Sequence, residues 1–175
     1  IVVTNNITIL PKCDQIIVMK DGKIQQFGTP NDIYDEPVNR FVADFIGESN
    51  IVEGRMVEDY VVNIYGQDFD CVDMGITENK KVEVVIRPED ISLVSKNDGL
   101  FKAKVDSMLF RGVHYEICCK DRKGYEWVIQ STKKANVGSE VGLYFEPEAI
   151  HIMVPGETEE EFDKRIESYE DYHHA

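Results

Sequence analysis

The stretch KAKVDSMLFRGVHYEICC, residues Lys102–Cys119, decides the fold class of this chain. Two runs rich in β-branched, aromatic and long apolar residues, Lys102–Phe110 and His114–Cys119, flank Arg111-Gly112. Runs of this composition on either side of a glycine-containing turn predict an antiparallel β-hairpin. We expect Gly112 to take a positive φ angle before the second strand, since glycine adopts such angles without a steric penalty.

Further strand signals lie on both sides of this hairpin, and turn-forming residues such as Asn97-Asp98-Gly99 separate them. The additional predicted strands are Val57–Tyr65, Lys81–Ile86, Glu126–Gln130 and Val141–Phe145. Short strands at this spacing are typical of a small antiparallel barrel or sandwich. We therefore predict a mainly β domain over residues 49–154, long enough for one modest core.

The first part of the chain, residues 1–48, has a mixed strand and helix pattern. Ile1–Thr4 is predicted to be a buried strand, at which the chain has been cut open. Gln15–Met19 and Lys23–Phe27 flank the hairpin signal Asp21-Gly22. This region is therefore predicted to be α/β.

Two short helices are predicted to follow that hairpin. Thr29 can cap the first, Pro30 suits its first position, and Pro37 restricts its end. The second is predicted to span Val38–Ile46 and to stop at Gly47.

The last segment, residues 155–175, is acidic, with eight Asp and Glu against two Lys and Arg. Thr158-Glu159-Glu160-Glu161 is a capping-box pattern, and Phe162, Ile166 and Tyr169 then form one narrow apolar stripe. These features predict a short acidic helix. The pattern leaves three alternatives open: packing on the chain's own barrel, binding of a partner, and a frayed end.

The composition limits the classes of function. The chain has 175 residues and a net charge of −14, and it lacks an apolar run long enough to span a bilayer. Such a charge opposes nucleic acid and anionic membrane surfaces, and it suits a cationic ligand as well as plain solubility. The four cysteines form no C-x-x-C pair, so we predict structural thiols in a reducing cytoplasm and no metal site.

Several stretches carry a family resemblance. Cys13–Ile24, continued by Gly28-Thr29-Pro30, resembles the end of the nucleotide-binding domain in ABC transporters of the maltose, iron and polyamine import group. Phe41–Asn50 resembles that family's exit helix into its accessory domain. Ile86–Ile91 and the later Phe145–His151 resemble the repeated turns of the TOBE domain, an oligonucleotide-binding-like (OB-like) barrel.

Three other stretches narrow the resemblance within that group. Leu109–Glu116, Trp127–Thr132 and Glu140–Leu143 look like the spermidine/putrescine importers. The resemblance implies a remnant of an ABC ATPase domain in residues 1–48 and a TOBE domain in residues 49–154.

The resemblance also implies a role and partners. In the family, the barrels of two ATPase subunits pack together and steady the dimer while the nucleotide domains open and close. We therefore expect an accessory or regulatory domain, a homodimer through the barrel, and permease subunits bound through the ATPase domain. The expected location is cytoplasmic, peripheral at the inner face of the cell membrane, without membrane insertion and without bound nucleic acid.

The ATPase motifs themselves are absent from this sequence. It contains no Gly-x-x-x-x-Gly-Lys-Ser/Thr loop, no Leu-Ser-Gly-Gly-Gln-like signature and no Walker B strand ending in paired acids. We expect no enzyme activity and no cofactor in this chain alone, whereas ATP and magnesium are expected of a full-length parent. The family places a switch histidine after a Val-Thr strand, but here Asn5 follows Val3-Thr4, a degenerate switch position.

The candidate site residues fall into two groups. Residues of the family turns are predicted to be structural: Arg87, Pro88, Glu89, Asp90, Gly112 and Glu148. Arg87 is expected to bond within its own turn. His114, Tyr115 and Trp127 are candidate ligand-binding residues because aromatic faces attract organic cations, and core packing is the alternative reading of each. No catalytic residue and no metal ligand is predicted.

Two other functions remain open at this stage. A small-ligand sensor could bind a polyamine or an ion and inhibit uptake. Single-strand nucleic-acid binding would need a basic groove, which is hard to assemble from 19 Lys and Arg against 33 Asp and Glu.

Overall fold

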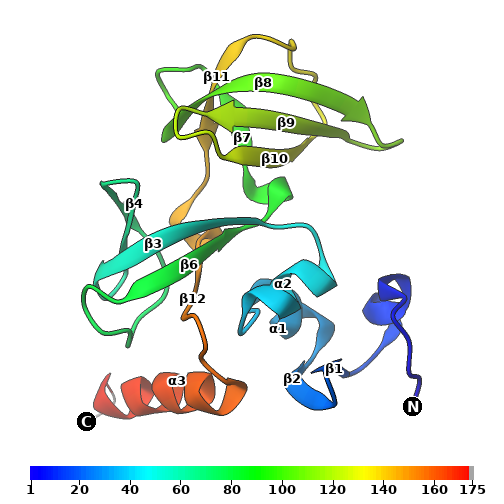
Figure 1. Cartoon of the computed structure of the whole chain (residues 1–175), viewed down its shortest axis with the longest axis vertical. Helices are drawn as coiled ribbons and strands as arrows, with labels where there is room; N and C mark the ends of the chain where they lie inside the picture. The colour runs from blue at the N-terminus through cyan, green and yellow to red at the C-terminus, as the bar shows by residue number, and fades with distance from the viewer. Residues whose placement is uncertain (174–175) are drawn as a thin grey trace.

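The computed structural model describes the backbone of residues 1–173 and the side chains of residues 1–167. Its main body consists of two five-stranded antiparallel sheets (Figure 1). The first, in the order β10-β9-β8-β11-β7, contains β7 (Ser92–Val94), β8 (Phe101–Phe110), β9 (Tyr115–Asp121), β10 (Glu126–Ser131) and β11 (Glu140–Tyr144). The second, in the order β12-β6-β3-β4-β5, contains β3 (Asn50–Glu58), β4 (Val61–Ile64), β5 (Gln67–Asp70), β6 (Lys81–Ile86) and β12 (His151–Met153). The predicted mainly β, antiparallel architecture is confirmed.

The chain passes between the two sheets at two short 3₁₀ turns. One of them, η2 (Pro88–Asp90), connects β6 to β7, and the other, η3 (Pro147–Ala149), connects β11 to β12. A proline begins each turn, because its fixed φ angle and missing N–H suit the first position. The two stretches that resemble TOBE turns are therefore the two crossings between the sheets (Figure 1).

One hydrophobic core fills the space between the sheets. Trp127 is fully buried, and its ring stacks on Phe101 and Phe145 with centroids 5.5 and 6.3 Å away. Burial alternates along β9 and β10, where Ile117 and Ile129 also point inward. This alternation is what a strand with one face on a core requires.

A buried amide closes the gap between the sheets at the edge strand β10. The Asn50 side chain donates to the carbonyl oxygens of Val128 (2.8 Å) and Ile86 (3.2 Å) and accepts from the N–H of Val128 (2.7 Å). Next to it, the Tyr125 hydroxyl accepts from the N–H of Ile51 (2.7 Å). The bonds to Val128 satisfy backbone groups that the edge strand β10 leaves unpaired, and the bond from Ile51 ties the inner strand β3 to Tyr125, the residue before β10.

The N-terminal region contains η1 (Ile7–Lys12), the hairpin of β1 (Ile16–Lys20) and β2 (Lys23–Gly28), and the helices α1 (Pro30–Asp35) and α2 (Arg40–Ile46). Thr29 and Asp32 form a capping box at α1. The second helix begins later than predicted because the Asn39 side chain caps it, accepting from the N–H of Val42. Its Ala43 packs on the second sheet against Ile51, Val85 and Met153.

Two strand predictions are wrong. Ile1–Thr4 is exposed and lies in no strand, because a strand needs a partner for its backbone groups and none of residues 1–173 pairs with it. Val57–Tyr65 is divided between β3 and β4 by a tight turn in which Tyr60 takes φ 67°. The β-branched and aromatic residues on both sides of Glu58-Asp59 favour one continuous strand, which hid the reversal of the chain.

The predicted acidic helix is present as α3 (Glu159–His173). The hydroxyl of Thr158 accepts from the N–H of Glu161, whose carboxylate accepts from the N–H of Thr158, as a capping box requires. Phe162 packs against the N-terminal core, so the helix lies on its own chain. The predicted stripe residue Tyr169 lies outside the described side chains. Within the described residues, no helix is long and apolar enough to cross a bilayer.

Removing the Asn50 amide tests how much its bonds between the two sheets stabilise the fold. We expect Asn50→Ala to lower the free energy of unfolding by about 2–4 kcal/mol, because buried polar groups left unpaired cost about 1–3 kcal/mol each. Urea denaturation measures the change. Asn97→Ala in the exposed β7–β8 loop is the control, with an expected change within about 0.5 kcal/mol. Equal losses in both variants would contradict the closure role of Asn50.

Candidate functional site

Arg87 connects the first crossing turn to the N-terminal helices. Its side chain is buried, with 6% of the residue exposed. One terminal nitrogen donates to the carbonyl oxygens of Ala43 and Glu48, each at 3.4 Å, and to the Ser49 hydroxyl. The other donates to the carbonyl oxygen of Tyr34. The prediction that Arg87 bonds within its own turn is therefore wrong.

Arg87 bonds to the two helices and not to its own turn because the helix ends supply carbonyl acceptors. The carbonyl groups of Tyr34 and Ala43 belong to the last turns of α1 and α2, where helix carbonyls carry partial negative charge, and the Ala43 carbonyl also accepts from the N–H of Gly47. The Tyr34 ring adds a cation–π contact, its centroid 4.0 Å from the guanidinium carbon, and its hydroxyl donates to Glu89. Burial lowers the pKa of Arg87, but a guanidinium remains charged at neutral pH.

The other predicted turn residues are spread over several elements. Pro88 is buried within the first crossing turn, whereas Asp90 and Glu148 are exposed. Gly112 takes φ 94° in the β8–β9 turn, a conformation that favours glycine. Asn5 is exposed in the segment before η1.

The three candidate ligand-binding residues do not converge on one cavity. Trp127 lies in the core, and its indole N–H donates to Asp121 (3.0 Å). His114 and Tyr115 are half-buried at the far end of the β8–β9 hairpin. The ring of Tyr115 contacts Phe110, with a centroid separation of 5.0 Å. Trp127 is therefore a core residue, whereas the rings of His114 and Tyr115 are partly exposed at the end of the hairpin.

A different region gathers charged groups around a cavity. We call it the acidic cavity: a space of about 550 Å³ between the end of α1, the β5–β6 loop, η3 with β12, and α3. Its carboxylates are Asp35, Glu36, Asp73, Glu148, Asp163 and Glu167. Its apolar lining is formed by Val72, Ile150, Phe162 and Ile166. Among the described residues that line it, none is Lys or Arg.

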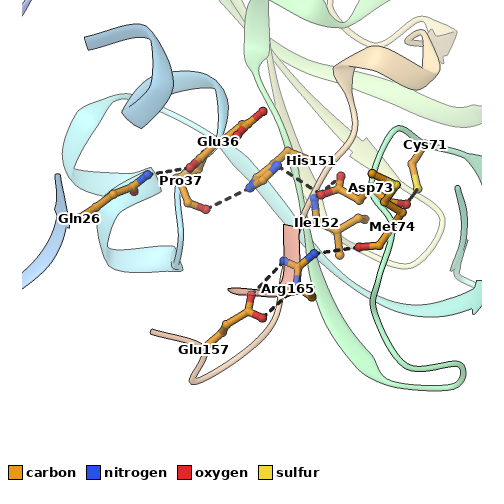
Figure 2. A network of polar contacts seen from close by, with 10 residues as sticks. All are labelled: Gln26, Glu36, Pro37, Cys71, Asp73, Met74, His151, Ile152, Glu157 and Arg165. Atoms are coloured by element: carbon orange, nitrogen blue, oxygen red, sulfur yellow. Dashed lines mark hydrogen bonds and ion pairs between the residues drawn. The ribbon is translucent and has the colours of Figure 1, made fainter. Parts of the chain in front are cut away.

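Two buried titratable groups lie at the inner wall of the acidic cavity (Figure 2). His151 Nε2 lies 3.1 Å from the carbonyl oxygen of Pro37, and because a carbonyl only accepts, Nε2 carries the proton. His151 Nδ1 faces Asp73 Oδ1 at 3.7 Å, while Asp73 Oδ2 accepts from the N–H of Ile152 (3.0 Å). Burial raises the pKa of Asp73 to about 7 and lowers the pKa of His151 to about 4.

The side chain of Arg165 joins α3 to the segment before it and to a loop of the barrel. Arg165 binds Glu157 through two parallel hydrogen bonds of 3.0 Å each, and both side chains are 10% exposed. The same guanidinium donates to the carbonyl oxygen of Met74 (2.9 Å) in the β5–β6 loop (Figure 2). A bidentate pair of this kind fixes direction as well as distance, so it sets how α3 leaves the segment before it, while the bond to Met74 joins the helix to the barrel.

Sequence reasoning did not identify Asn50, Asp73 or the Arg165–Glu157 pair. The pattern Thr158–Glu161 located α3, but nothing in it indicated which loop the helix would contact. Asp73 lies in the loop that follows β5, a strand that the sequence did not reveal.

The fold and its two crossing turns define an antiparallel OB-like β domain. Residues 84–153 match the family model of the TOBE domain. This segment runs from β6 to β12 and includes both crossings, so the chain contains a TOBE domain, as the resemblance implied.

A solved structure has a similar fold. The cytoplasmic molybdate-binding protein ModG, solved with molybdate bound, superposes with a TM-score of 0.53 at 14% sequence identity. The alignment covers 61% of this chain and 96% of the ModG chain. At this identity the likeness concerns the fold alone.

Substituting Arg87 tests its connecting role. We expect Arg87→Met to lower the free energy of unfolding by about 2–4 kcal/mol, because four hydrogen bonds are lost and buried acceptors remain. Hydrogen exchange should show faster opening of α1 and α2 than of β8 and β9. Arg55→Met, at an exposed arginine with one backbone bond, is the control. Unchanged exchange in both helices would contradict this role of Arg87.

The Asp73–His151 pair makes a prediction about pH. In the wild type, native Asp73 holds its proton up to about pH 7, and unfolded His151 holds one up to 6.5, so their contributions nearly cancel. Asp73→Asn leaves only the lowered histidine pKa, so stability should fall as pH drops from 6.5 toward 4. His151→Gln leaves only the raised aspartate pKa, so stability should fall as pH rises from 3.8 toward 7.

Urea denaturation across this pH range measures the two slopes. Each should approach about 1.4 kcal/mol per pH unit, the value for one proton. The slopes have opposite signs because burial makes the native state hold an extra proton at Asp73, whereas it makes the native state lack a proton at His151. Two variants with slopes of the same sign would contradict the assignment.

Proposed function

We propose that this chain is the accessory and regulatory end of an ABC import ATPase for polyamines of the spermidine/putrescine class. The contact made by Arg87 carries the proposal. It bonds the first crossing of the TOBE domain to α1 and α2, the helices that resemble the end of an ABC nucleotide-binding domain. A rigid contact there would transmit motion of an ATPase domain to the barrel as a rotation.

The choice of polyamines is supported by sequence and by charge. Leu109–Glu116 and Trp127–Thr132 resemble the spermidine/putrescine importers, and the net charge of −14 is compatible with handling cations. In this proposal ATP and magnesium act in the full-length parent and not in this chain alone. The chain lies at the inner face of the membrane, held there by permease subunits through the ATPase domain.

The barrel is proposed to pair with a second copy. Leu109, Phe110 and Val113 expose 53%, 58% and 83% of their surfaces at the end of the β8–β9 hairpin. Adjacent exposed apolar side chains favour a protein contact, since burying them releases water.

Light scattering of the full chain tests this pairing. We expect a concentration-dependent dimer that Phe110→Ser weakens. Ile24→Ser, at an apolar residue of similar exposure on β2, is the matched control and should leave the dimer intact. A monomer at high protein concentration, or equal weakening by both variants, would remove self-association through this hairpin from the proposal.

The transporter assignment has a direct test of its own. The DNA immediately upstream of the codon for Ile1 should encode, in frame, a P-loop and an ABC signature motif. A stop codon or an unrelated domain at that place would refute the assignment to an import ATPase without affecting the dimer.

A second candidate function is ligand sensing by the barrel, and the acidic cavity favours it. ModG is described as a molybdate-binding protein, but an oxyanion is a poor fit for this cavity, because like charges would repel it. A sensor of this kind would bind a cation and inhibit uptake.

A further inference from the structure

Two hydrogen-bond acceptors face each other at the inner wall of the acidic cavity. Asp73 and His151 expose 8% and 13% of their side chains, and Asp73 Oδ1 and His151 Nδ1 are 3.7 Å apart. That distance exceeds the reach of a direct hydrogen bond. Among the described residues, the one hydrogen bond to the Asp73 carboxylate is donated by the N–H of Ile152 to Oδ2, and the Arg165 guanidinium also acts on that carboxylate electrostatically. A ligand group that carries several N–H donors would bond to both acceptors at once.

The rim of the cavity adds negative charge on separate elements. Asp35 and Glu36 come from the end of α1, Glu148 from η3, and Asp163 and Glu167 from α3. The described residues contain no group of three or more metal-ligating side chains close enough to hold an ion. Carboxylates that are spread out in this way suit a cation with several separated charges better than they suit one metal ion.

The remaining lining is apolar and lies between these charges. Val72, Ile150, Phe162 and Ile166 line the same cavity. Methylene groups between two charged nitrogens would bury against such side chains, which favours binding because apolar surface leaves water. A volume of about 550 Å³ accommodates an extended chain of this kind.

We propose that the acidic cavity binds a linear alkyl diamine or polyamine, with one ammonium group donating to Asp73 Oδ1 and His151 Nδ1. The other ammonium groups lie against the rim carboxylates. This inference rests on the second candidate function, ligand sensing, and it assigns that function a site and a ligand class.

A ligand in the acidic cavity would also contact α3. This helix forms one wall of the cavity through Phe162 and Ile166. It also contacts the N-terminal region, where the Glu159 carboxylate accepts from the N–H of Phe27 (2.6 Å). A bound amine would therefore hold α3 against the barrel and the β1–β2 hairpin together.

Calorimetric titration of the full chain with spermidine, at physiological salt and about pH 8, tests the site. At that pH the amines are charged and the Asp73 carboxyl is ionised. We expect saturable binding that Asp73→Asn weakens at least about tenfold, the effect of losing one charge-assisted bond. Asparagine keeps an oxygen for the N–H of Ile152 and points an NH₂ group toward His151, so the fold should persist.

Matched controls separate this site from general attraction to an acidic protein. Asp98→Asn, in the exposed β7–β8 loop, makes the same change in net charge and should alter affinity by less than about twofold. Glu148→Gln and Glu167→Gln, on the exposed rim, should each weaken binding by about two- to fourfold. These rim variants also keep the test decisive if Asp73→Asn does not fold.

Three results would overturn the proposal. These are equal weakening by Asp73→Asn and Asp98→Asn, tighter binding of Mg²⁺ than of spermidine, and competition by molybdate. Light scattering and the upstream DNA test the accessory-domain proposal independently, so a chain that dimerises but binds no amine would refute only the cavity assignment.

Discussion

The buried guanidinium of Arg87 is the interaction on which most of the tertiary arrangement depends. A buried charge must be satisfied in full, because an unpaired one is costly. Arg87 meets this requirement with backbone carbonyls from the ends of two helices and with the Ser49 hydroxyl. Its position in the first crossing turn therefore fixes where α1 and α2 lie relative to both sheets.

The residue after Ser49, Asn50, joins the two sheets. Its side chain bonds both backbone groups of Val128 on the edge strand β10. Arg87 holds Ser49 and so fixes where β3 begins. Asn50, the first residue of β3, then joins the two sheets through its bonds to Val128. The core around Trp127 is enclosed as a result.

The same placement of α1 shapes the acidic cavity. Gln26 donates to the carbonyl oxygen of Glu36 (2.9 Å) and accepts from the N–H of Val38 (3.0 Å), which orients the carbonyl of Pro37 between them toward His151 (Figure 2). His151 then faces Asp73, and Arg165 binds the adjacent loop from α3. Four segments that are distant in sequence meet at one polar network, and the candidate site exists only where they meet.

The sequence by itself determined the local elements of this protein. Runs rich in β-branched and apolar residues located β6 and the β8–β9 hairpin. Asp21-Gly22 located the first hairpin, and Thr158–Glu161 located the start of α3, because each signal acts between residues close in the chain. Only the tertiary structure decided the partners of Arg87 and Asn50 and the meeting of Asp73 with His151. Those contacts join residues tens of positions apart, and local periodicity carries no information about which distant carbonyl or carboxylate a side chain will face.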